Sequence, residues 1–275
     1  YYGGDTVLLN AVIAEVERQG AEAIPVFGYP GGVAFEGLLL DPEGQPRADT
    51  SLAFLFRFAN FEAAKALERL NIPVVSMISL YGRSEAEWRE SKTGLSIFEG
   101  TFQVAVPEIA GTVAPTVVGS HEKVVDEETG LTIVMRSPIA SRVTLAVGRA
   151  LRYGTLRVKA NAEKRIALMF YNYPPGKASI GASYLNVAES LSNVLRGMRD
   201  EGYDLGTADL SAESVLEDIT TKARNIGGYA PGELDALLAE GTAILIPVSD
   251  YQQWLDGYAP AFRNKIIADW GDPAD

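Results

Sequence analysis

The sequence predicts an α/β protein with two Rossmann-like α/β lobes, mostly parallel sheets and a long helix that joins the lobes. Short β-branched runs such as Ile72–Ile78 alternate with amphipathic helical segments. The composition, 47% hydrophobic and 22% charged, is typical of globular domains, and 275 residues are enough for two ordinary cores. We therefore expect a first α/β domain at 1–137, a connecting helix at 138–161 and a second α/β domain at 162–275.

Both ends of the chain suggest a fragment of a longer polypeptide. The sequence begins without an initiator Met and leads directly into a helix, where an α/β unit usually has a strand. Its last residues, WGDPAD, are equally abrupt. We expect the first domain to be truncated at its N-terminus and the second at its C-terminus.

The first domain is predicted to alternate helices and strands, which favours parallel pairs with right-handed crossovers. The strands expected there are Ala23–Phe27, Leu52–Phe56, Ile72–Ile78, Thr116–Val118 and Leu131–Met135, the last two separated by an acidic turn at Asp126–Gly130. Helices are expected at Asp5–Gln19, at Asn60–Leu70 and after Ser84, where Ser84 and Glu87 form a capping-box pattern. The Gly- and Pro-rich stretch Gly28–Asp49 predicts a long surface connection, and Ile97–Val106 is compatible with either a helix or a strand.

The connecting helix is predicted at Ile139–Lys159, because apolar residues recur on one face and basic residues occupy its C-terminal, negative dipole end. The second domain should begin with a buried strand at Ile166–Tyr171. A helix with Ser183 as its N-cap should follow and stop at Gly202. The remaining predicted elements are helices at Ala212–Arg224, Pro231–Ala239, Tyr251–Gly257 and Ala259–Trp270, and a strand at Ala243–Val248.

The strongest candidate site in the sequence is the loop Asn172–Gly181. It would lie at the carboxyl end of a strand and the amino end of a helix, where open α/β sheets bind ligands. Exposed amides and the Lys177 ammonium suit ligand carboxylates, and tyrosine rings suit a flat apolar face. An equally weighted alternative is that its prolines and glycines only shape a tight connection. The substrate-binding residues expected from these arguments are Asn172, Tyr173, Lys177, Tyr184 and, from a second segment, Arg83.

Three single residues outside that loop carry weaker arguments. Arg83 follows the expected strand Ile72–Ile78 and could meet a ligand carboxylate. Glu99 lies between aromatic residues, where a carboxyl group can have a raised pKa, although an exposed and inert position is the alternative. His121 is the only histidine and is expected to be a loop residue rather than a metal ligand. We assign no catalytic residue and no metal site.

Several common chemistries lack their motifs. There is no cysteine, which excludes disulfides, thiolate metal sites and cysteine nucleophiles within this chain. Neither a Walker A motif nor G-x-G-x-x-G after a strand occurs, so ATP or dinucleotide binding by those devices is not expected. The net charge of −12 argues against nucleic-acid and anionic-membrane binding; it serves solubility or, alternatively, attracts a cationic ligand or a basic subunit. No signal or membrane span is visible, which favours the cytoplasm.

Most of the chain resembles one family. The stretch YNYPPGKASIGASYLNVAESL, followed by EGYD, is similar to the large subunit of class I cobaltochelatase and, less closely, to the porphyrin-binding subunit of magnesium chelatase. The segment SMISLYGRSEAEWRESKTGLSIFEGTFQVAVPEIAG, then APTVVGS, resembles the part that precedes it in those subunits. PGELDALLAEG and the YQQWLDG and WGDP runs also fit. Because these large subunits are much longer, the match is to an interior portion.

The resemblance implies a part of a ligase that forms nitrogen–metal bonds. The intact protein would insert Co²⁺, as a substrate, into hydrogenobyrinic acid a,c-diamide during cobalamin biosynthesis. ATP and Mg²⁺ would be bound by separate AAA+ motor subunits, and no cofactor by this segment, which would be inactive alone. The family's catalytic His and Glu groups are expected C-terminal to this fragment.

Three alternatives stay open. The nearest is the magnesium chelatase large subunit, which would insert Mg²⁺ into protoporphyrin IX. The second alternative belongs to another functional class: a non-catalytic scaffold or partner-docking module. A free-standing small-molecule binding protein of periplasmic type is the third, and the lack of a signal argues against it.

Overall fold

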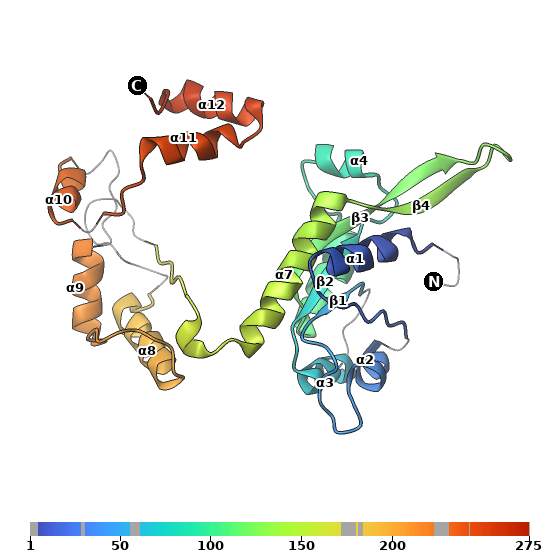
Figure 1. Cartoon of the computed structure of the whole chain (residues 1–275), viewed down its shortest axis with the longest axis horizontal. Helices are drawn as coiled ribbons and strands as arrows, with labels where there is room; N and C mark the ends of the chain where they lie inside the picture. Colours follow the sequence, from blue (N-terminus) through green and yellow to red (C-terminus); the bar gives the residue numbers. More distant parts are fainter. Residues whose placement is uncertain are drawn as a thin grey trace. The chain divides into compact units, whose positions relative to one another are not determined.

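The computed structural model describes residues 5–28, 31–55, 61–171, 180, 184–222, 231–241 and 243–274 of the chain (Figure 1). The chain divides into two compact units, Tyr1–Ala160 and Asn161–Asp275.

A four-stranded sheet forms the centre of the first unit. Its strands are β1 (Ser51–Ala53), β2 (Val74–Ser79), β3 (Val113–Val125) and β4 (Thr132–Pro138), in the spatial order β1-β2-β3-β4. β1, β2 and β3 run parallel, and β4 pairs antiparallel with β3 as a hairpin. The α/β class and the mostly parallel sheet are therefore confirmed. β2 is the only one of these strands with a parallel neighbour on each side, and five of its six residues are buried.

Two helices, α1 (Val7–Arg18) and α7 (Ala140–Val158), cover one face of this sheet (Figure 1). Leu8 and Val12 of α1 and Val143 and Val147 of α7 pack with Met77 in one buried cluster. The approach is close, because a Cβ on Gly119 of β3 would lie 2.4 Å from a methyl carbon of Leu8. The predicted long helix therefore exists, but it packs across the sheet of the first unit.

Helices α2 (Gly31–Leu39) and α3 (Phe61–Leu70) bury a second cluster with β1 and the start of β2 (Figure 1). The predicted surface connection Gly28–Asp49 is thus wrong over α2, where Phe35 and Leu39 are buried despite the flanking glycines. The predicted strand Ala23–Phe27 is also wrong, because this segment pairs with no strand and exposes Ile24, Val26 and Phe27.

The crossover from β2 to β3 consists of short helices on the other face of the sheet. They are α4 (Glu85–Glu90), α5 (Ile97–Glu99), the π-helix η1 (Gly100–Ala105) and α6 (Val106–Ile109). Ser84 and Glu87 form the predicted capping box, with the Glu87 amide donating to the Ser84 hydroxyl. The ambiguous segment Ile97–Val106 is helical. A third buried cluster joins this crossover to Ile78 and Val117 of the sheet.

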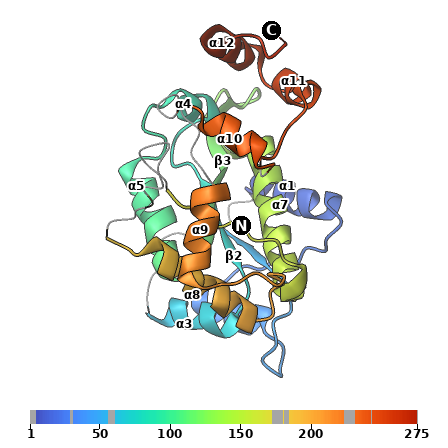
Figure 2. The same cartoon turned by 90° about the vertical axis from the view of Figure 1, so that its left-hand side faces the viewer.

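The described part of the second unit contains helices and no strand (Figure 2). They are the 3₁₀-helix η2 (Asn161–Glu163) and the α-helices α8 (Val187–Asp200), α9 (Ala212–Lys222), α10 (Glu233–Ala239), α11 (Val248–Asp256) and α12 (Pro260–Trp270). α8 packs against α9, and the buried Ser192 hydroxyl of α8 donates to the Leu210 carbonyl. The N-cap of α8 is Asn186, whereas the predicted cap, Ser183, lies outside the described residues.

The strands predicted at Ile166–Tyr171 and Ala243–Val248 are wrong. Both segments lack a strand, and Met169 and Ile244 are more than nine-tenths exposed. An apolar run alone does not make a strand, because its backbone N–H and C=O groups need a neighbouring ladder. Among the described residues of this unit, no such neighbour exists.

Among the residues that the structure describes, no helix is both long enough and apolar enough to span a membrane.

Candidate functional site

The candidate site lies at the carboxyl end of β2, the end at which open α/β sheets bind ligands. The chain does not leave the sheet there at once. The Leu80 amide donates to the Gly119 carbonyl (2.9 Å), and the His121 amide donates to the Arg83 carbonyl (2.8 Å). The loop from Leu80 to Arg83 is therefore fixed along β3, and the positions of its side chains follow from the sheet.

A buried carboxylate, Glu99, anchors this loop. Ser96 caps α5, and the Glu99 side chain completes a capping box by accepting from the Ser96 amide (2.7 Å) and hydroxyl (2.8 Å). It also accepts from the Tyr81 amide (2.8 Å) and forms an ion pair with Arg83, while remaining fully buried. One carboxylate therefore joins the start of a helix to the end of a strand.

The charge state of Glu99 follows from these contacts. Burial disfavours the charged form, but hydrogen bonds from the Tyr81 amide and from Ser96, with the positive charge of Arg83, outweigh it and hold the pKa of Glu99 below its usual value. Neither alternative expected from the sequence holds: the pKa of Glu99 is lowered rather than raised, because hydrogen-bond donors reach it among the aromatic residues, and the side chain is buried rather than exposed. Glu99 is therefore a structural anion near neutral pH.

Arg83 is mostly engaged inside the protein. Besides Glu99, it donates through Nη1 to the Gly94 carbonyl (3.1 Å). Its Nε is buried and has no hydrogen-bond partner among the described residues. Contact of Arg83 with a ligand carboxylate stays a prediction, and such a contact would use the Nη–H groups that Glu99 and Gly94 do not occupy, because Nε is buried.

Gln103 fixes the π-helix to the end of β2. Its side-chain Nε2 donates to the Ser79 carbonyl (3.0 Å), and its Oε1 accepts from the Ser79 amide (3.2 Å). The side chain thus pairs with the backbone of Ser79 in the way that a neighbouring strand would. Ser76 donates to the Gln103 carbonyl (3.3 Å). π-turns often occur at functional sites. The sequence analysis missed Gln103, although a polar residue within an otherwise apolar helix face was a usable signal.

His121 is held in one tautomer. Its Nδ1 accepts a hydrogen bond from the Gly82 amide (2.8 Å), so the neutral ring carries its proton on Nε2. Burial and then the nearby charge of Arg136 lower the pKa of His121. His121 lies within β3 rather than in the predicted loop, and at neutral pH its Nε2 is a hydrogen-bond donor.

Three rings beside these polar contacts form a surface that we call the aromatic ledge: Tyr81 and Phe98, which are exposed, and His121, which is partly buried. The Tyr81 ring centroid lies 5.2 Å from that of Phe98 and 6.4 Å from that of His121. Tyr81 is 67% exposed, and the neighbouring Ile97 is 90% exposed. The network around Glu99 thus holds an apolar surface at the carboxyl end of β2.

The other substrate-binding residues predicted from the sequence lie in the second unit. Asn172, Tyr173 and Lys177 are outside the described residues. Tyr184 is fully exposed and has a φ of 70°, in the left-handed region that non-glycine residues rarely adopt. Such a conformation is compatible with a functional loop and does not by itself assign a role.

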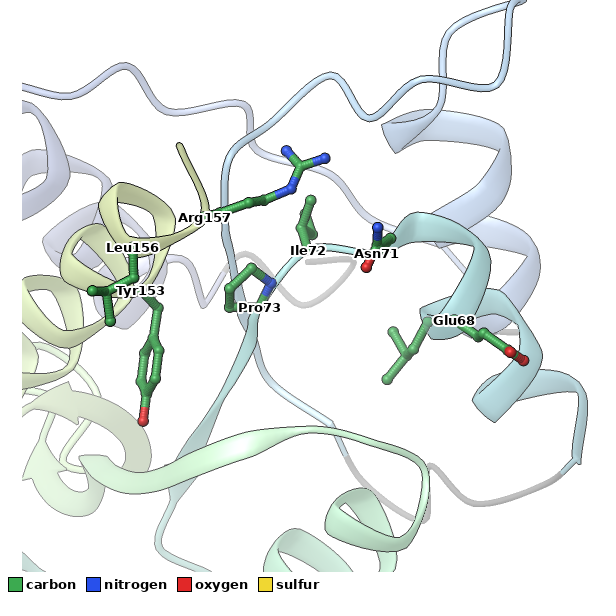
Figure 3. Close-up of a pocket in the computed structure, with 8 residues that line it drawn as sticks. Glu68, Asn71, Ile72, Pro73, Tyr153, Leu156 and Arg157 are labelled. Carbon is green, nitrogen blue, oxygen red and sulfur yellow. The ribbon is translucent and has the colours of Figure 1, made fainter. Parts of the chain in front are cut away.

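A depression at the opposite, amino end of β2 is less suited to a small ligand. Its volume is about 530 Å³, it is wide open to solvent, and the residues that line it are drawn in Figure 3. Its lining residues are Leu67, Glu68, Asn71, Ile72, Pro73, Tyr153, Leu156 and Arg157. Ligand pockets normally bury most of their ligand, and parallel sheets bind at the other end. We therefore place the candidate site at the carboxyl end.

Metal-ligating side chains do not gather in the described ranges: among them, no group of three or more His, Asp or Glu side chains is arranged to hold a metal ion.

Comparison with known proteins identifies relatives over the whole chain. The family model described as CobN/Magnesium Chelatase matches residues 1–275. The chloroplastic magnesium-chelatase subunit ChlH of Oryza sativa subsp. indica is 31% identical over 231 residues, which cover 78% of this chain and 16% of ChlH. The aerobic cobaltochelatase subunit CobN of Sinorhizobium sp is 26% identical over 278 residues, which cover 98% of this chain and 21% of that subunit.

A solved structure shares the fold. The catalytic subunit of cobaltochelatase from Mycobacterium tuberculosis superposes with a TM-score of 0.73 at 23% identity, over 98% of this chain and 22% of that subunit. The chain thus spans about a fifth or less of the length of these relatives.

Proposed function

The chain belongs to the CobN/magnesium chelatase family, and on that premise we propose that it is part of the tetrapyrrole- and metal-binding large subunit of an ATP-dependent cobaltochelatase. The intact subunit would insert Co²⁺ into hydrogenobyrinic acid a,c-diamide in cobalamin biosynthesis. The observation that carries this proposal is the family match over the entire chain, residues 1–275.

The choice of cobalt rests on coverage and on motifs. The cobaltochelatase relative aligns with 98% of the chain, against 78% for the rice magnesium-chelatase subunit. The stretch that begins YNYPPGKASIG also resembles the cobalt subunits more closely. Magnesium insertion into protoporphyrin IX is the second candidate, and the higher identity to the rice subunit, 31% against 26%, favours it.

ATP hydrolysis and metal insertion would take place on different subunits. AAA+ motor subunits would bind ATP and Mg²⁺, in keeping with the lack of a Walker A motif in this sequence. Co²⁺ would be a substrate, and this segment would hold no resident cofactor. The complex would work in the cytoplasm, and this segment alone would be inactive.

Within the subunit, the segment would supply part of the substrate-binding surface and contacts to the rest of the polypeptide. The loop residues Asn172, Tyr173 and Lys177, with Tyr184, would contact the macrocycle and its carboxylates. Arg83 would add the Nη–H groups that its contacts with Glu99 and Gly94 do not occupy. These assignments rest on residue chemistry and on the family.

Metal insertion by the full-length polypeptide that contains this chain tests the proposal. The polypeptide would be combined with the motor subunits and ATP and offered Co²⁺ with hydrogenobyrinic acid a,c-diamide, or Mg²⁺ with protoporphyrin IX. We expect ATP-dependent cobalt insertion, followed by the change in the corrinoid absorption spectrum. Insertion of magnesium alone would establish the second candidate. If both reactions failed while the motor subunits still hydrolysed ATP, the result would favour the alternative that the segment is a non-catalytic scaffold.

A further inference from the structure

We propose that the aromatic ledge of Tyr81, Phe98 and His121 binds one flat face and one peripheral carboxylate of the tetrapyrrole. This inference rests on the proposed function and deepens it, because it assigns to substrate binding three residues of the first unit that were not expected from the sequence to bind substrate.

The rings present the shape that a flat conjugated ligand needs. Tyr81 and Phe98 lie 5.2 Å apart between centroids at an angle of 49°, and Tyr81 meets His121 nearly edge to face. Aromatic groups prefer such offset or tilted contacts, so a macrocycle can extend the group on its open side. The large exposed fractions of Tyr81 and Ile97 leave an apolar surface in water, which is typical of binding sites.

Hydrogen bonds within the first unit hold the backbone that carries the ledge. The Tyr81 amide is bonded to the buried Glu99 and the Gly82 amide to His121, while Leu80 is fully buried. Phe98 belongs to the helical turn that Ser96 caps. Little conformational entropy is therefore lost on binding, which favours affinity from a small surface.

Polar groups at one side of the ledge suit a carboxylate. The Gly82 amide occupies Nδ1 of His121, so Nε2–H is the donor that the ring can offer. Arg136 lies directly opposite His121 in the β3–β4 pair and is half exposed. Asp5 lies near this guanidinium (3.9 Å) and neutralises part of its charge. Together, His121 and Arg136 would hold a peripheral acid, and His121 would act as a donor rather than as a metal ligand.

The second unit provides a matched control. Tyr258 and Phe262 also lie 5.2 Å apart, and both are about half exposed. No histidine accompanies this pair, because His121 is the only one in the chain. If exposed aromatic rings were enough, the two pairs would bind the macrocycle equally.

The test is a titration of the 275-residue chain with deuteroporphyrin IX, a soluble dicarboxylic porphyrin, and with its dimethyl ester. Binding would be followed by the shift of the main porphyrin absorption band. We expect Tyr81→Ala to weaken binding of both ligands about tenfold or more, and Tyr258→Ala to change it less than twofold. His121→Ala should weaken binding of the acid several-fold and leave binding of the ester nearly unchanged. Thermal melts of each variant would verify that it is folded.

Each other outcome overturns the inference in a distinguishable way. Binding by the wild type that Tyr81→Ala and His121→Ala leave intact would refute the ledge and spare the proposed function. No binding of either porphyrin by the wild-type chain would also refute the ledge, and the insertion assay on the full-length polypeptide would then judge the proposed function independently. A change of oligomeric state in Tyr81→Ala without a change in affinity would make the ledge a contact between protein chains.

Discussion

In the first unit, β2 runs between two parallel neighbours and buries Val74, Val75 and Met77 almost completely. In the second unit, the segment Ile166–Tyr171 has a similar apolar composition, yet it forms no strand and exposes most of its side chains. The difference lies in the surroundings of each segment rather than in its own residues. A strand is stable when other strands pair with its backbone and helices cover its faces.

The same contrast separates the two exposed aromatic pairs. Tyr81 stands on a loop whose amides are bonded to Glu99 and His121. Tyr258 lies in the short connection between helices α11 and α12, whose described side chains are mostly exposed. Rigid support, rather than exposure alone, therefore distinguishes a candidate binding surface from an ordinary exposed ring.

The largest expected effect compares the two apolar segments directly. Met77→Ala should lower the free energy of unfolding of the first unit by about 2–5 kcal/mol, because it leaves a cavity between β2 and helices α1 and α7. Met169→Ala, in the segment Ile166–Tyr171, should change stability by less than about 0.5 kcal/mol, since Met169 is 95% exposed. Amide hydrogen exchange measured at β2 and at α8 reports each unit separately. Equal effects of the two substitutions on stability would show that the two segments do not differ in burial as described.

A smaller effect is expected at the buried ion pair. Glu99→Gln should destabilise the first unit by about 2–3 kcal/mol, because Arg83 loses its buried counter-ion. Glu85→Gln, in the exposed pair with Arg89, is the control and should cost less than about 0.5 kcal/mol. Urea unfolding followed by exchange of the β2 amides measures both variants. If Glu99→Gln lowered the free energy of unfolding no more than Glu85→Gln does, the Glu99 carboxylate would not anchor the loop.

The same carboxylate sets a pH dependence. Because its folded pKa lies below the ordinary value of 4.5, its charged form is favoured by folding, and the stabilisation is fully present above that value. It should be lost as the pH falls through the folded pKa. In Glu99→Gln, the first unit should lose less stability between neutral and acidic pH than the wild type does. An unchanged acid profile would refute the lowered pKa.

The elements that were predicted correctly are those whose structure is determined mainly by residues close together in the sequence. The β-branched run of β2, the Ser84 capping box and the stripe of α7 each carry their own signal. Helix α2 was missed because three of its nine residues are glycines, and its helical state depends on packing of Phe35 and Leu39 against α3 and β1. Tertiary contacts of this kind override propensity.

The candidate site was predicted only in part, for the same reason. Arg83 and Glu99 were each singled out, but their pairing joins the end of β2 to the start of α5, across 16 positions of sequence. Neither the fixed tautomer of His121 nor the clamp of Gln103 on Ser79 could be derived without the register of β2 and β3. The predicted contacts of the loop Asn172–Gly181 stay predictions.

The most direct test of the account is amide hydrogen exchange of the full 275-residue chain with and without deuteroporphyrin IX. The account predicts that the porphyrin slows exchange at the amides of Tyr81 and Gly82 and around Phe98, while those of α11 and α12 keep their rates. Slowing confined to the second unit, with unchanged rates at Tyr81 and Gly82, would contradict a binding site at the carboxyl end of β2.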